Sequence, residues 1–137
     1  MSVASALAAR IMETWAHGQD VADALGQTRA PSGRLRQVAF LGYRAIPNSY
    51  RSHGLEGPET AVRVELDGTD GERWVFGPDE ATDRVRGPAV DLVVTQRRHL
   101  NDTDLACNGA VPSEWVGIAE AFAGPPGPGR RPGQFAP

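Results

Sequence analysis

A glutamate and a histidine four residues apart carry the clearest chemistry in this sequence. Glu13 and His17 lie in the run from Ile11 to Asp20. If this run is helical, the two side chains project from successive turns of one face. A carboxylate oxygen and an imidazole nitrogen can then reach one cation at about 2.0–2.2 Å. This spacing makes Glu13 and His17 candidate ligands of a divalent metal, with zinc as the expected ion. The alternative that spacing alone leaves open is a surface contact worth about 0.2–0.5 kcal/mol.

Two ligands do not complete a catalytic metal site. Zinc in enzymes has about three protein ligands and an open position, so at least one more ligand must come from elsewhere. His53 lies in a Gly-flanked turn and His99 stands beside two arginines, and we predict that both are surface or capping residues. Asp20 is a candidate to orient His17 by a hydrogen bond, as metal-bound imidazoles usually require, although such a carboxylate is also a routine surface feature.

The element that must position the pair is a helix over residues 2–25. Apolar residues recur there at helical spacing, and Gly26 stands where a C-terminal cap is expected. The predicted inward stripe consists of Leu7, Ile11, Trp15, Gly18 and Ala22. Glu13 and His17 fall on the opposite side among alanines rather than long polar residues, so we expect this helix to be packed on both sides.

The rest of the chain predicts an α+β fold. A change from helical to alternating periodicity at Ala61 marks the beginning of the strands. The expected elements are a helix over 34–50, a hairpin over 61–76, an edge strand over 81–86, a helix over 88–99, a short strand over 105–108 and a helix over 112–124. The sheet is expected to be small, antiparallel and packed with two helices. The predicted boundaries are 1–53, 54–124 and a disordered Pro/Gly tail over 125–137.

The run from Met12 to Val21 resembles the last bundle helix of the DinB-like metal-binding proteins, in particular the mycothiol-dependent maleylpyruvate isomerase group from actinobacteria. In that group a Glu-x-x-x-His on this helix joins a His from an earlier helix to hold the metal, and Glu13 and His17 occupy the matching positions. The segments 66–74, 83–94 and 114–122 are similar to the group's small C-terminal domain. The resemblance implies the C-terminal half of such a protein, whose N-terminal helices remain from a four-helix bundle.

The resemblance also implies a function, namely a metal- and thiol-dependent isomerase or transferase half with mycothiol as the thiol cofactor. Similar proteins place an Arg near the metal, so Arg97 and Arg98 are candidate catalytic residues that can hold a carboxylate of a small-molecule substrate or cofactor. Their alternative role is to place positive charge at a helix C-terminus. A second reading is a non-catalytic, truncated metal-binding or interaction fragment. A third is a domain resembling the terminal domain of wyosine-forming enzymes, without catalysis of its own.

Composition limits the classes of partner and the cellular compartment that we expect for this protein. The net charge is −3 and no basic stripe exists, so we expect no nucleic-acid partner. The apolar N-terminal stretch meets Arg10 before it reaches membrane-spanning length, so we expect no membrane association. Cys107 is the single cysteine, which excludes an internal disulfide and favours a reducing, cytoplasmic location. A second copy or a partner chain is expected to cover the first helix, with a homodimer as one form.

Overall fold

A computed structural model describes residues 2–93, 98–119, 127 and 130–134 of this protein. Its helices are α1 (Val3–Ala24), α2 (Leu35–Arg44), α3 (Ile46–Ser52), α4 (Ala89–Val93), the 3-10 helix η2 (Leu100–Asp102) and α5 (Ala110–Ile118). Its strands are β1 (Val62–Asp67), β2 (Arg73–Phe76), β3 (Asp83–Pro88) and β4 (Ala106–Asn108). The predicted α+β class is confirmed, with helices first and a sheet packed with helices after them.

The four strands form one sheet in the order β2-β1-β3-β4. The predicted hairpin is β1 and β2, which run antiparallel, and β3 and β4 are antiparallel as well. The expectation of a wholly antiparallel sheet is wrong, because β1 and β3 run parallel. After β2 the chain returns across the end of the sheet and begins β3 beside the start of β1, with Val62 opposite Asp83. The strand predicted at an edge therefore lies inside the sheet.

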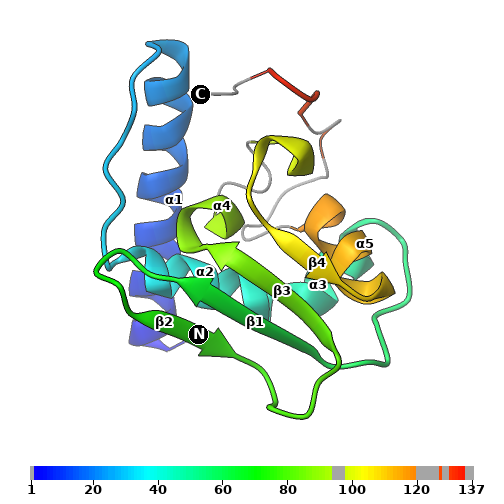
Figure 1. The fold of residues 1–137 in the computed structure, drawn as a ribbon. Helices are drawn as coiled ribbons and strands as arrows, with labels where there is room; N and C mark the ends of the chain where they lie inside the picture. Colours follow the sequence, from blue (N-terminus) through cyan, green and yellow to red (C-terminus); the bar gives the residue numbers. More distant parts are fainter. Residues whose placement is uncertain (1, 94–97, 120–126, 128–129, 135–137) are drawn as a thin grey trace.

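The helices and the sheet share one hydrophobic core. Figure 1 shows the helices behind the sheet and α1 standing along one side of the molecule. Val64, Leu66 and Val85 point from the sheet into this core, where they join Leu35 of α2 and Trp115 of α5. Alternation leaves the other face of the sheet polar. Residues on both sides of the predicted boundary at 53 thus contribute to the same core.

The first helix ends as its sequence predicts. Its last residue is Ala24, and Gly26 follows with φ of 63°, a left-handed conformation that suits a glycine at a helix end. The Gln27 amide then donates to the Ala22 carbonyl at 2.8 Å. No helix among the described residues is long and apolar enough to cross a membrane.

The face that α1 turns toward the core matches the predicted stripe only in part, since Ala22 is buried as predicted and Leu7 is not. The buried positions are Met12, Ala16, Gln19 and Ala22, whereas Leu7 is 60% exposed. Ile11 and Trp15 lie at the margin of the buried face and are partly covered. The buried face of α1 carries small residues such as Ala16, and α2 is its main neighbour. The side of α1 with small residues is therefore the one that faces the core.

Other element boundaries also differ from prediction. The helix expected over 34–50 is divided at Ala45 into α2 and α3. Pro47 lies in the first turn of α3, where backbone N–H groups have no partner within the helix, so the missing N–H of proline costs nothing there. The short strand expected over 105–108 is β4. The last helix begins at Ala110, earlier than predicted. Within the tail predicted to be disordered, the described segment 130–134 includes a turn whose Gly133 amide donates to the Asp102 carboxylate at 2.8 Å.

Candidate functional site

Glu13 and His17 lie on the side of α1 that faces away from the core. Their side chains are 50% and 80% exposed. Glu13 accepts a hydrogen bond from Arg10 at 3.3 Å, and the His17 Nδ1 lies 3.9 Å from an Asp20 carboxylate oxygen. Both contacts lie on the helix surface, where such pairs contribute little to stability. The helix therefore carries an exposed carboxylate and an exposed imidazole that contribute little to the stability of the fold.

The backbone under this pair is held by Arg29. The loop after α1 runs back along the helix, and the Arg29 guanidinium donates to the Trp15 carbonyl at 2.7 Å. The same group lies 5.3 Å from the centre of the Trp15 ring, which is a cation–π contact. A side chain at Gly18 would place its Cβ 3.2 Å from this guanidinium. The glycine next to His17 therefore has a packing role, which is to let Arg29 lie across the helix.

The described residues do not complete a metal site. Among residues 2–93, 98–119, 127 and 130–134, no group of three His, Cys, Asp or Glu side chains can hold an ion. Asp20, the candidate to orient His17, also lies 3.8 Å from Arg130 of the tail. Glu13 and His17 thus remain two predicted ligands that need at least one more from outside the described part of the chain.

The other two histidines have structural partners, as the sequence predicts. The His53 Nδ1 lies 2.8 Å from the Ser49 carbonyl at the end of α3. The His99 Nδ1 accepts a hydrogen bond from the Asn101 amide at 3.2 Å and thereby caps η2. Neither imidazole lies on α1. The prediction that both are capping or surface residues is confirmed by these contacts.

Of the two candidate catalytic arginines, Arg97 lies outside the described residues, and Arg98 is bound to α1. The Arg98 guanidinium donates to both oxygens of Asp23, at 2.6 and 2.7 Å. The side chains of Asp23 and Arg98 are 7% and 15% exposed. Hydrogen bonds from Arg98, assisted by Gln19, hold the pKa of Asp23 below its usual range despite desolvation by burial. Asp23 follows His17 by six residues, which is about 120° around the helix, so the structure does not bring Arg98 to the Glu13 and His17 pair.

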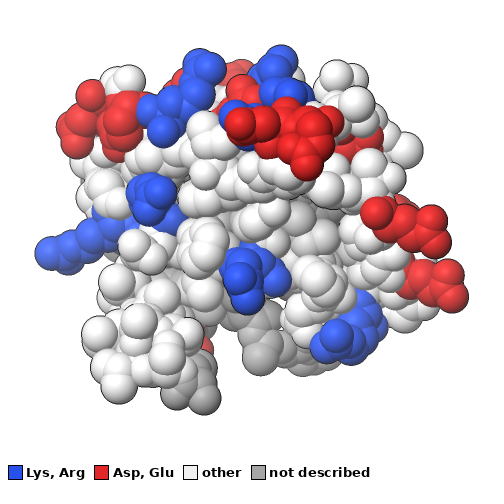
Figure 2. Space-filling model, turned by 90° about the horizontal axis from the view of Figure 1, so that it is seen from below, with Lys and Arg blue, Asp and Glu red and all other residues white. Residues whose placement is uncertain are grey.

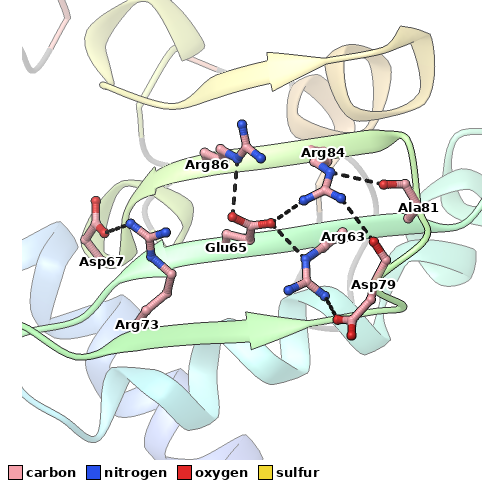
Figure 3. A network of polar contacts seen from close by, with 8 residues as sticks. All are labelled: Arg63, Glu65, Asp67, Arg73, Asp79, Ala81, Arg84 and Arg86. Carbon is pink, nitrogen blue, oxygen red and sulfur yellow. Dashed lines mark hydrogen bonds and ion pairs between the residues drawn. The ribbon is translucent and has the colours of Figure 1, made fainter.

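Among the residues that the structure describes, an extensive polar cluster lies on the open face of the sheet, and sequence analysis did not identify it. The Glu65 carboxylate accepts hydrogen bonds from Arg63 at 2.8 Å, Arg84 at 2.5 Å and Arg86 at 3.3 Å (Figure 3). Arg63 also binds Asp79. The hydrogen bond from Arg63 contributes most to holding the pKa of Glu65 below its ordinary value.

The alternation of the strands contains the signal for this cluster. Arg63 and Glu65 flank an inward Val64, and Arg84 and Arg86 flank an inward Val85, so all four polar side chains share the open face. Recognising the cluster requires knowing that β1 and β3 are neighbours. Since each guanidinium is paired with a carboxylate, we interpret this cluster as structural. On the face seen in Figure 2, basic and acidic side chains are likewise interspersed and separated by uncharged areas.

Comparison with known proteins gives relatives but no family. No protein-family model matches the chain, and no solved structure matches it. Two proteins of Mycobacterium tuberculosis, one from strain CDC 1551 / Oshkosh and one from strain ATCC 25618 / H37Rv, are each 48% identical to it over 132 residues. Both bear the description "uncharacterized protein". The alignment covers 95% of this chain and 51% of each relative, so the chain spans about half the length of the curated relatives it matches.

Proposed function

We propose that this chain binds a divalent cation, with zinc as the expected ion, through Glu13 and His17. The observation that carries the proposal is that the two side chains are exposed one helical turn apart and are used by no core contact. A Glu and a His at this spacing can reach one ion. The resemblance to the mycothiol-dependent maleylpyruvate isomerases gives these two positions the role of ligands.

The described residues do not complete the site, so the proposed function requires a ligand from outside them. The pair is part of a site whose remaining ligand comes from another polypeptide segment. The two relatives are about twice as long as the aligned region, which supports a larger protein in which another half contributes. They also come from an actinobacterium, as the resemblance leads one to expect. In such a complete site the ion would act as a Lewis acid in a thiol-dependent isomerisation or transfer, with mycothiol as the thiol cofactor.

Arg98 has a different proposed role from the one expected of a substrate-binding arginine. Its bidentate bond to Asp23 ties the chain at Arg98 to α1. A cytoplasmic location is part of the proposal, because Cys107 is a free thiol and half-buried. Burial raises the pKa of this thiol, which makes it a poor nucleophile.

The proposal is tested by titrating the purified chain with Zn²⁺ or Ni²⁺ in a calorimeter. We expect binding in the parent and its loss in Glu13→Ala and in His17→Ala. The matched control is the double variant His53→Ala/Glu56→Ala, which removes the same two residue types at positions outside α1. Equal binding by the parent and the α1 variants would refute the metal function.

A second candidate function is an interaction fragment without catalysis. The observation that favours it is the exposure of large apolar side chains on the outer side of α1. Exposed apolar strips of this kind mark surfaces that bind other chains. In this case Glu13→Ala and His17→Ala leave metal binding unchanged, and the apolar strip alone determines association.

A further inference from the structure

The outer side of α1 has the residue spacing of a helix–helix interface. Seven residues recur at steps of four or three, close to the spacing that places side chains along one seam of a coiled coil. We call them the outer seam: Val3, Leu7, Arg10, Thr14, His17, Val21 and Leu25. At about 100° per residue they fall within a sector of about 80°. Four of them are large apolar residues that are 60% exposed or more.

The apolar residues of the outer seam are symmetric about Thr14, whereas Arg10 lies four residues before Thr14 and His17 three residues after it. The apolar residues lie at the two ends, Val3 and Leu7 at one and Val21 and Leu25 at the other. Thr14 is the midpoint of the seam, and polar residues flank it on both sides. If a second α1 packs against the first in the opposite direction, with Thr14 opposite Thr14, the apolar ends of one copy meet the apolar ends of the other. Such self-complementarity is the property that an isologous two-fold interface requires.

The same arrangement brings the predicted ligands of both copies together. In this register Glu13 of the second copy lies two residues from His17 of the first, which is about 3 Å along the helix axis. The two-fold axis is perpendicular to both helices, so it places Glu13 and His17 of both copies on the same side of the seam. Arg10 lies near the same level, and its side chain turns toward Glu13, with which it pairs at 3.3 Å.

We propose that a second copy of this chain packs antiparallel along the outer seam and supplies Glu13 as the third ligand of the metal site. This inference rests on the proposed metal function for the ligands, but the helix pairing rests on the seam alone. Contacts of α1 with the rest of the described chain support it, because α2 covers only the opposite side of the helix. Polar residues at the centre of such a seam fix its register at some cost in stability.

Cysteine cross-linking tests the direction and the register of the pairing. In a Cys107→Ala background, Thr14→Cys places the new thiol on the two-fold axis, and we expect a disulfide-linked dimer on mild oxidation. Val3→Cys is the matched control, because in the antiparallel pair the two copies of position 3 lie at opposite ends of a helix of about 33 Å. We expect it to remain monomeric on a denaturing gel. Equal cross-linking of both variants would show a parallel pair and overturn the proposal.

Light scattering separates the failure of this inference from the failure of the metal function. We expect a dimer in metal-free buffer that Zn²⁺ strengthens, and an association at least tenfold weaker in Leu7→Asp/Val21→Asp. A monomer that binds Zn²⁺ through Glu13 and His17 would overturn the dimer and leave the metal function standing, and would point to a helix of a longer protein as the occupant. A dimer that binds no Zn²⁺ would support the pairing and refute the pooled site.

Discussion

Replacing Asp23 with Asn removes the charge that Arg98 binds across the interface between α1 and the segment after α4. Both side chains are nearly inaccessible to water, and two hydrogen bonds of 2.6 and 2.7 Å join them. Removing one partner of a fully buried ion pair costs about 3–5 kcal/mol, whereas an exposed pair contributes at most about 1 kcal/mol. The Asp23–Arg98 pair lies between these two cases, because its side chains are still 7% and 15% exposed and asparagine keeps a hydrogen-bonding group, so we expect Asp23→Asn to lower the free energy of unfolding by about 2 kcal/mol at pH 7.

The pH dependence of this effect has a definite sign. The pKa of Asp23 in the folded chain is held below its usual range, chiefly by hydrogen bonds from Arg98. A carboxyl whose pKa falls on folding stabilises the protein above its unfolded pKa of about 3.9, and this contribution is lost as the pH falls through the folded value. The parent and Asp23→Asn should therefore differ most above about pH 5 and converge in acid.

Urea unfolding followed by circular dichroism measures this difference at several pH values. Arg98→Ala should destabilise the chain by a similar amount, and the double variant Asp23→Asn/Arg98→Ala by less than the sum of the two single changes. Glu59→Gln, at an exposed position, is the matched control and should change stability by less than about 0.5 kcal/mol. The reasoning is refuted if Asp23→Asn and Arg98→Ala both unfold with the parent, or if their effects are strictly additive.

Three further predictions follow from other parts of the fold. Glu65→Gln leaves three guanidiniums without their shared carboxylate and should lower the free energy of unfolding by about 1 kcal/mol in urea. Asp67→Asn is the control and should have a smaller effect, because the pair of Asp67 with Arg73 is exposed and measures 3.4 Å. Gly109→Ala should lower the free energy of unfolding by about 1–3 kcal/mol, because φ is 109° and the new Cβ would lie 2.6 Å from the Asp83 carboxyl. Gly117→Ala, on α5, is the matched control: its Cβ meets nothing within 4 Å, so it should raise the free energy of unfolding by about 0.5–1 kcal/mol. Burial, with the nearby Glu114 carboxylate, raises the pKa of Tyr50 to about 12, so ultraviolet titration should show one tyrosine ionising near that pH, and Tyr50→Phe should abolish this late step.

Local signals in the sequence predicted the helices and strands well, but they did not predict contacts between residues that are distant in the sequence. The length and the glycine end of α1 follow from helical spacing and from Gly26, and the β1–β2 hairpin follows from alternation around a short turn. The side of α1 that faces the core did not follow, because the helix has apolar residues on two sides and hydrophobicity favoured the bulkier one. Only the position of α2 shows that Ala16 lies inside and Leu7 outside.

The polar contacts show the same limit more sharply. Asp23 and Arg98 are 75 residues apart, and nothing in the neighbourhood of either residue predicts the other. Glu65 gains Arg84 and Arg86 as neighbours only because β3 pairs in parallel with β1. Strand direction depends on how the connection returns across the sheet, which periodicity does not encode. Within the described part of the chain, the side of α1 that carries Glu13 and His17 is exposed, whereas the sequence predicts a helix packed on both sides. The role of these two residues as ligands stays a prediction.

The thin attachment of α1 has a consequence for the motions of the chain. The helix packs mainly on α2, and the Asp23–Arg98 pair ties its C-terminal end to the segment after α4. Strands β1 and β3, in contrast, lie inside the sheet and each pairs with a neighbouring strand on both sides. Segments with few covering contacts open at a lower free energy than the core and do so as cooperative units. Amide protons of α1 should therefore exchange with solvent earlier than those of β1, and covering the outer side of the helix should slow them.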